Sequence, residues 1–282
     1  MSATSIRPAG ALPSWLQPRP RPPLLGWVMA RPPAINPPAT PRPRGASEPC
    51  RPSDRTGMEP DAATRRRFRL WLRGLRSLRG DLRSARWSDD QAQLGTLVGR
   101  FVAHMEAYCA ARAELDPVLW LSAPWASAAE RGAAYWLAGW RPTTLVHLLY
   151  TESGRRLEAQ LPDLLLGVRP GNLGDLGPAQ LARVDALHRR AVAEEDALSR
   201  EMARVQEGHG GVVTAGMALD AAALVARVGA VLRGADALRV RTMRQAVEIL
   251  RPAQAAELLI AAADLEIGFR EFGLKYGSGR DE

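Results

Sequence analysis

Apolar residues recur with the period of an α-helix along most of the chain downstream of residue 67. In the first such stretch, three or four positions usually separate the apolar residues: Phe68, Trp71, Leu72, Leu75, Leu78 and Leu82. This spacing places all of them on one face of a helix. The sequence shows no alternation of apolar and polar residues around a hairpin turn, as a sheet would require. It therefore predicts an all-α fold.

Capping signals and prolines divide this pattern into eight predicted helices. Ser127 and Glu130 have the spacing of a capping box, and the helix that they open should continue to a stop at Gly139. Pro178 suits the first turn of a long helix, which the glycine-rich stretch 208–211 should end.

The last part of the chain predicts separate helices over 224–232 and 235–250, followed by one that begins at Pro252. Because the links are short and no repeat of roughly 20 to 50 residues is present, the helices should form a single multi-helix bundle domain over about 62–276. Eight side chains are expected to face its core: Trp71, Leu97, Phe101, Trp136, Leu137, Leu148, Leu198 and Leu250.

Residues 1–57 differ in composition from the rest of the chain. They contain fourteen of the 22 prolines, and eight arginines against only Glu48 and Asp54. Dense prolines block helix formation and leave little apolar surface to bury, so we predict a disordered Pro/Arg-rich tail. The composition leaves two alternatives open, an organelle-targeting segment and a gene model that extends upstream of a start at Met58.

The formal net charge of +8 makes nucleic acid, an anionic membrane surface or an acidic protein a suitable partner. No stretch approaches the roughly 18 uninterrupted apolar residues that a spanning helix needs, so no insertion into a membrane is predicted. Between residues 65 and 86, nine arginines face only Asp81. Some are candidates for contacts with phosphate or an acidic partner, with a solvated face as the alternative: Arg65, Arg66, Arg67, Arg69, Arg73 and Arg76.

Signals for catalysis and metal binding are missing from the sequence. The two cysteines, Cys50 and Cys109, exclude a disulfide framework or a cysteine zinc cluster and fit a reducing compartment. Cys109 could serve as a redox switch, although a lone helical cysteine is usually a small buried hydrophobe. The chain has four histidines, and no two of them have the i, i+4 spacing of a zinc-binding helix: His104, His147, His188 and His209. Phosphate-loop, nucleophile-elbow and dinucleotide-binding patterns are absent, so we predict no enzyme and no metal site.

Residues 119–150 hold four of the eight tryptophans. They include a block of the form W…ER…W-L-x-G-W-R, here called the tryptophan motif: Trp125, Glu130, Arg131, Trp136, Leu137, Gly139, Trp140 and Arg141. Together with WLRGL at 71–75 and VAHMEAY at 102–108, which supply Trp71 and His104, this block resembles the seed-dormancy domain of delay-of-germination proteins. The same domain forms the C-terminal half of TGA-class basic leucine-zipper factors. The similarity covers roughly 66–275.

The resemblance implies a non-enzymatic plant regulator of transcription and seed dormancy, in the nucleus and/or cytoplasm. It would act through partners such as transcription regulators, with a homodimer also expected. The family is associated with sequence-specific DNA binding, but the segment before the first helix has no heptads. Phosphate contacts from one arginine-rich helix carry little base discrimination, so we expect DNA association to be indirect.

The resemblance also implies an alternative, a sensor domain for a small ligand, either haem or lipid. Haem would need an axial ligand such as histidine, and no histidine here maps to that role. The motif tryptophans are expected in the core, with interface anchors as the alternative. Glu130 is explained either by an ion pair with Arg131 or Arg141, or by the capping box.

Overall fold

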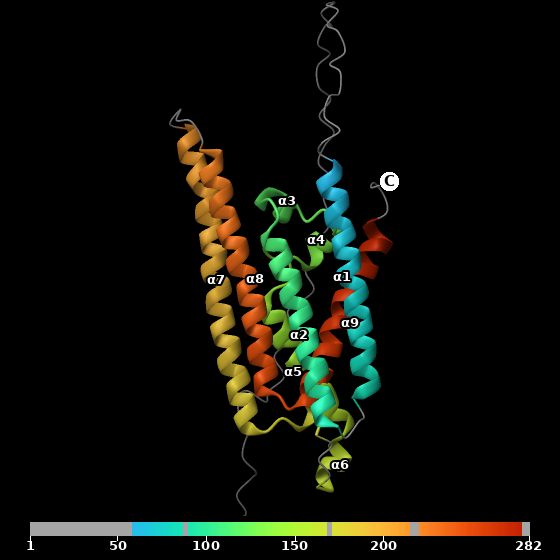
Figure 1. Cartoon of the computed structure of the whole chain (residues 1–282). Helices are drawn as coiled ribbons and strands as arrows, with labels where there is room; N and C mark the ends of the chain where they lie inside the picture. Colours follow the sequence, from blue (N-terminus) through green and yellow to red (C-terminus); the bar gives the residue numbers. More distant parts are fainter. Residues whose placement is uncertain (1–57, 87–89, 168–170, 215–219, 278–282) are drawn as a thin grey trace, which may run out of the picture. The chain divides into compact units, whose positions relative to one another are not determined.

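The structure of the protein is a computed structural model that describes residues 58–86, 90–167, 171–214 and 220–277. Within these ranges the chain is almost entirely helical, which confirms the predicted all-α class, and the one β-bridge joins Trp136 to Gly139 (Figure 1). The predicted tail over 1–57 lies outside the described residues. None of the described helices is long and apolar enough to cross a membrane.

The helices of the described residues follow one another through short links. They are α1 (Met58–Ala85), α2 (Gln91–Ala113), α3 (Pro117–Ser122), α4 (Ala128–Ala134), α5 (Pro142–Ala159), α6 (Leu161–Leu165), a 3-10 turn (Leu173–Asp175), α7 (Pro178–Thr214), α8 (Ala221–Ile249) and α9 (Pro252–Gly277). Pro117, Pro142, Pro178 and Pro252 each stand at the first position of a helix, where the missing N–H costs nothing.

Three predicted boundaries are wrong. α4 ends at Ala134 rather than at Gly139, since Tyr135 is already extended. α7 continues through 208–211, and the segments 224–232 and 235–250 form the single helix α8. Because α7 and α8 pack along each other (Figure 1), this packing outweighs a helix-propensity cost of about 1 kcal/mol per glycine. Gly234 in α8 even favours the packing, because a Cβ there would lie 2.9 Å from Leu198 of α7.

One hydrophobic core joins the helices. α1 packs on α2 and α9, and α2 also contacts α8, so that α2 lies between α1 and α8 (Figure 1). Half of the predicted core residues are buried: Trp71, Leu97, Phe101 and Leu250. The other half are half-buried at its margin: Trp136, Leu137, Leu148 and Leu198. Leu137, Leu148 and Leu198 nevertheless pack against the core, as predicted. Trp136 does not belong to this set, because it lies in a turn, which the next section describes, and not in a helix.

The two faces of α1 allow a direct test of this packing. Leu75 is 1% exposed and Leu70 is 49% exposed on the same helix. We expect Leu75→Ala to lower the free energy of unfolding by about 2 to 5 kcal/mol, because it leaves a cavity in the core. The matched substitution Leu70→Ala should change it by less than about 0.5 kcal/mol. Urea unfolding followed by circular dichroism measures both, and equal effects would contradict the described orientation of α1.

Candidate functional site

The three sequence blocks that carry the resemblance meet in one aromatic cluster. The ring of Trp71 (α1) stacks on Tyr108 (α2) with centroids 4.1 Å apart, and on His104 at 6.0 Å. Phe68 bridges Trp71 to Trp125, which follows α3 and is buried. The prediction that these tryptophans contribute to the core therefore holds for Trp71 and Trp125.

His104 has a packing role in this cluster. Its Nε2 lies 3.0 Å from the carbonyl oxygen of Trp71, and since a carbonyl only accepts, Nε2 carries the proton and donates. A Cβ at Gly74 would lie 2.6 Å from the His104 ring, so glycine at this position lets α1 approach α2.

The centre of the tryptophan motif is a tight turn over 136–139. Trp136 N–H donates to the carbonyl oxygen of Gly139 at 2.5 Å, and Gly139 N–H donates back at 3.3 Å. The two central residues are not glycines, yet both have left-handed backbones, with φ of 48° at Leu137 and 60° at Ala138. Residues other than glycine adopt this conformation at a cost, so the surrounding structure must hold the turn.

Two buried arginines hold this turn through its carbonyl oxygens. Arg239 of α8 donates to the carbonyls of Trp136, of Leu137 at 3.1 Å and of Trp140 at 2.8 Å. Arg112 of α2 donates to the carbonyl of Ala138 at 2.9 Å. A Cβ at Gly139 would lie 3.0 Å from the Arg239 guanidinium, which explains the glycine of the motif.

Asp236 lies between the two arginines. Its Oδ1 accepts from Arg112 and, at 2.6 Å, from Arg239, and all three side chains are buried. We call this trio the arginine clamp. Burial lowers the pKa of Arg239, while Asp236 opposes that effect. Burial is also the largest single effect on the pKa of Arg112 and lowers it, but Asp236, Tyr108, Cys109 and Tyr135 together outweigh burial, so the pKa lies above its ordinary value. Both guanidinium groups therefore stay protonated at physiological pH.

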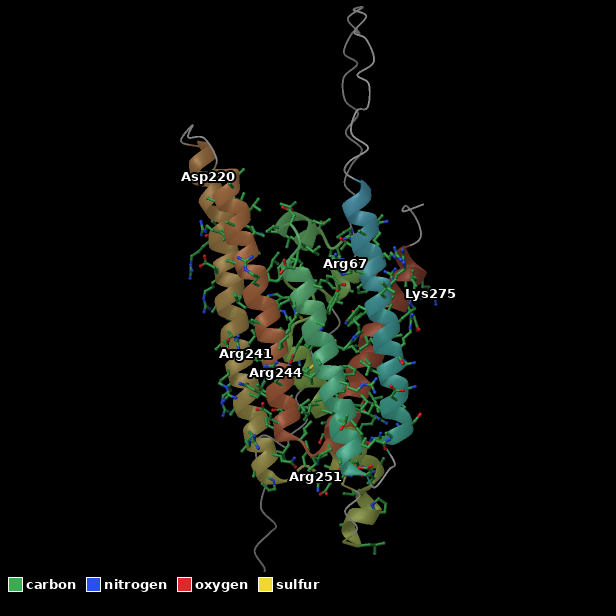
Figure 2. The ribbon with its side chains drawn as sticks, viewed as in Figure 1. Arg67, Asp220, Arg241, Arg244, Arg251 and Lys275 are labelled. Atoms are coloured by element: carbon green, nitrogen blue, oxygen red, sulfur yellow. The ribbon has the colours of Figure 1, made fainter. Side chains whose placement is uncertain are left out.

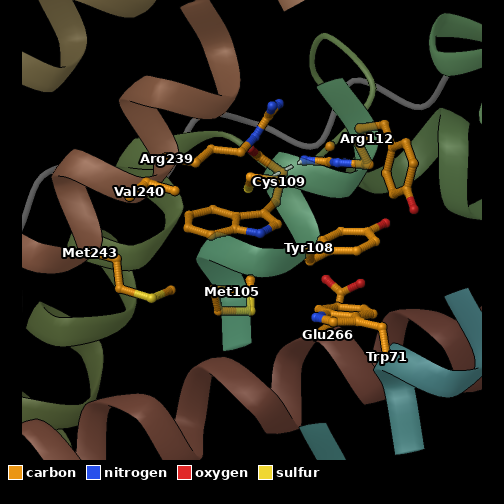
Figure 3. A pocket seen from close by; sticks show the side chains of 12 residues that line it. Trp71, Met105, Tyr108, Cys109, Arg112, Arg239, Val240, Met243 and Glu266 are labelled. Atoms are coloured by element: carbon orange, nitrogen blue, oxygen red, sulfur yellow. Dashed lines mark hydrogen bonds between the residues drawn. The ribbon is translucent and has the colours of Figure 1, made fainter. Parts of the chain in front are cut away.

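A small cavity beside the clamp contains one further acid, Glu266 of α9 (Figure 3). Burial raises the pKa of Glu266 to about 7, with Glu130 adding to the rise and Arg112 and Arg239 opposing it. The cavity has a volume of about 20 Å³, which is room for about one water molecule. Cys109 also lines it, and burial raises the pKa of its thiol, which favours a packed cysteine over a reactive thiolate.

Glu130 forms an ion pair, but with Arg270 of α9 and not with Arg131 or Arg141. Its Oε2 lies 2.9 Å from Nη1 of Arg270 and also accepts from Ser127 N–H at 2.6 Å. The Ser127 hydroxyl accepts from Glu130 N–H, so the predicted capping box is confirmed. A Cβ at Gly273 would overlap the Glu130 side chain, and glycine there lets α9 approach α4.

The remaining motif residues also anchor backbone or neighbouring helices. Arg131 is half-buried and donates to the carbonyls of Ala123 and Ala126. The Trp136 indole donates to Ser199 Oγ of α7 at 3.0 Å. Arg141 is exposed, lies 5.5 Å from the centroid of the Trp136 ring and pairs with Glu195 at 3.4 Å. Glu195 is buried and caps the first turn of α5 through Thr143 N–H at 2.7 Å. Trp140 is half-buried and packs against the core.

The structure describes the side chains of three histidines, His104, His147 and His188. His104 uses Nε2 on a backbone carbonyl, whereas the exposed His147 and the half-buried His188 lie with their Nε2 atoms 3.2 Å apart. No group of three metal-binding side chains occurs among the described residues. The second internal cavity, which Phe101 and Leu145 help to line, measures about 30 Å³ and is far smaller than a porphyrin.

The basic face of α1 has no internal partner. Its six arginines are exposed, and none forms an ion pair with a described residue: Arg65, Arg66, Arg67, Arg69, Arg73 and Arg76. The next two arginines along α1, Arg79 and Arg83, both pair with Asp264 of α9. Along α1, the outer face toward the start of the helix is thus free to meet an external anion.

Replacing one member of the clamp should destabilise the whole protein. We expect Arg239→Gln to cost about 3 to 5 kcal/mol of unfolding free energy, because the turn carbonyls lose their donors in a buried site. Arg241→Gln on the same helix removes only an exposed pair with Glu194 and should cost less than about 1 kcal/mol. Urea unfolding of both variants measures the contrast. Similar small losses would show that the clamp does not hold the turn.

The raised pKa of Glu266 predicts a dependence of stability on pH. The folded pKa of about 7 lies above the ordinary value of 4.5, so this group's contribution is fully present below about pH 4.5 and is lost as the pH rises through 7. Glu266→Gln should therefore match the wild type near pH 4.5 and exceed it by roughly 3 kcal/mol at pH 8. The exposed Glu271→Gln is the control. Urea midpoints from pH 4.5 to 8 measure the difference, and parallel pH profiles for all three proteins would refute the prediction.

Comparison with known proteins agrees with the residues that form this site. A family model described as "Seed dormancy control" matches residues 74–151, a stretch that includes His104 and the whole tryptophan motif. Protein DOG1-like 3 of Arabidopsis thaliana is 31% identical over 211 residues, which cover 66% of this chain and 74% of that protein. Protein DOG1-like 2 of the same plant is 28% identical over 221 residues, covering 72% and 86%. The chain therefore belongs to the seed dormancy control, or delay-of-germination, family.

Proposed function

We propose that the protein is a non-enzymatic regulator of seed dormancy that acts through protein partners in the control of transcription, in the nucleus and/or cytoplasm. Membership of the family supports the link to dormancy. The relation to TGA-class factors, on which the link to transcription rests, stays a prediction, as does the homodimer.

One observation carries the proposal for partners. The tryptophan motif is engaged inside the domain, whereas the six exposed arginines between Arg65 and Arg76 form no ion pair with the described residues. Charged surface that the fold leaves unpaired is available to an external anionic partner, and it steers association.

A catalytic role receives no such support from the described residues. The buried polar groups that converge there, Arg112, Asp236 and Arg239, bind each other and backbone carbonyls. The cavity beside them has room for about one water and for no substrate. We therefore favour a binding function over chemistry.

The decisive experiment asks whether proteins or DNA are bound directly. Tagged full-length protein is recovered from developing seed, and co-purifying proteins are identified by mass spectrometry against the tag alone. We expect reproducible enrichment of transcription regulators. In parallel, the purified protein should bind a TGACG-containing duplex no better than a scrambled duplex at physiological salt, because phosphate contacts carry little sequence information.

A matched pair of variants distinguishes the contribution of the basic face of α1 to DNA affinity from the contribution of positive charge elsewhere on the protein. Replacing Arg66, Arg69, Arg73 and Arg76 with glutamine should lower the affinity for both duplexes equally and reduce the salt slope by up to about 0.9 per lost contact. The control replaces four exposed arginines that already form ion pairs, Arg155, Arg204, Arg241 and Arg244, and should have a smaller effect. A strong preference for the TGACG probe that only the α1 variant loses would make α1 a DNA reader and overturn the partner-mediated proposal.

A further inference from the structure

An open groove of about 470 Å³ lies where the start of α1, the segment around α4 and the end of α9 come together. Its ionisable lining consists only of arginines, and we call it the arginine groove: Arg65 and Arg69 from α1, Arg131 from α4, and Arg270 from α9. Figure 2 shows Arg67 and Lys275 on the same two helices at this end of the described domain, so further cations surround it.

Two of these arginines are held in place. Arg270 donates through Nη1 to Glu130 at 2.9 Å and to the carbonyl of Trp125 at 3.1 Å. Arg131 donates through Nη1 to the carbonyls of Ala123 and Ala126. Because each is fixed by one nitrogen, its orientation is set before any ligand arrives, and the rest of the guanidinium has no partner among the described residues.

The other two arginines are exposed and have no counter-ion. Arg65 and Arg69 stand one helical turn apart, and neither forms an ion pair with a described residue. Glu130 compensates only Arg270. Three positive charges of the groove therefore remain uncompensated and lie close together on its lining.

The floor of the groove is aromatic. Phe68 and Trp125 stack with centroids 6.4 Å apart, and Arg270 lies 5.7 Å from the centroid of Phe68. Leu274 forms part of the wall and is 56% exposed. Guanidinium groups bind carboxylates in a planar, bidentate manner, and an apolar floor accepts an aliphatic or aromatic side chain. Both features together fit a peptide better than a duplex, whose phosphates would need only the convex face of α1.

We propose that the arginine groove binds an acidic segment of a protein partner, in which carboxylates flank one large apolar side chain. The carboxylates pair with Arg65, Arg69 and the pinned Arg131 and Arg270, and the apolar side chain rests against Leu274 in the wall of the groove. The proposal rests on the proposed partner-mediated function and assigns that function to a specific surface.

The test measures binding of a defined probe by the full-length protein. The probe is a fluorescein-labelled peptide with glutamates and aspartates around one tryptophan, and fluorescence anisotropy is read at physiological salt. We expect Arg65→Glu with Arg69→Glu to weaken binding by at least about tenfold, because two charge pairs become repulsive. The matched control, Arg66→Glu with Arg73→Glu, changes the same charge on the same helix outside the groove and should weaken binding less than about threefold. Both pairs are exposed, so thermal unfolding midpoints should stay at the wild-type value.

Three outcomes would overturn the proposal: no binding of the peptide, equal weakening in both variants, or equal binding of a peptide with leucine in place of the tryptophan's acidic neighbours. Equal weakening would indicate a general attraction of α1 for anions. Recovery of partner proteins from developing seed distinguishes a failure of this inference from a failure of the proposed function. If the groove variant captures the same regulators as the wild type, the groove is not the docking surface although the function stands. If the wild type binds the peptide but captures no regulator, the proposed function fails while the groove remains a peptide site.

Discussion

The buried carboxylate of Asp236 is the interaction on which the tryptophan motif depends. It holds Arg112 and Arg239 together, and these two side chains supply the donors for the carbonyls of the 136–139 turn. The carboxylate of Asp236 does not neutralise two guanidinium groups, and Glu266 beside them, with a pKa of about 7, is only partly ionised at neutral pH, so part of a positive charge stays uncompensated. The carbonyl groups of the turn offset this positive charge, because their oxygens, the negative ends of their dipoles, face the guanidinium groups. Clamp and turn therefore stabilise each other, and neither would be stable in this place alone.

This arrangement explains why a left-handed turn forms without glycine at its centre. Leu137 and Ala138 adopt positive φ at a cost that the hydrogen bonds from α2 and α8 repay. The turn also places the Trp136 indole where it donates to Ser199 of α7, so that this single short segment contacts α2, α7 and α8. The physical role of the motif is thus to fix how α2, α7 and α8 meet.

The sequence predicted the helices well and the clamp not at all. Apolar periodicity and the proline and capping signals located most helices, because these signals are local. The end of α4 was misplaced because the residues after Ala134 form a turn whose donors are Arg112, 26 positions before Ala138, and Arg239, 102 positions after Leu137. A signal for the clamp did exist, since Arg112 follows Phe101 and Tyr108 at helical spacing, and Arg239 follows Leu232 and Ala235. A charged residue in phase with an apolar face predicts a buried partner but does not say which one.

The fold constrains the residues of the tryptophan motif more strictly than those of the candidate docking surface. Glycines at 139 and 273, the acid at 130 and the aromatic cluster are set by close contacts inside the domain, so changes there disturb folding. Arg65 and Arg69 touch no acid of the described domain, and the fold does not require them. Arg131 and Arg270 belong to both, since each binds backbone with one nitrogen and faces the groove. The fold therefore presents two fixed cations in the arginine groove, whereas Arg65 and Arg69 on the outer turn of α1 can change without disturbing the fold.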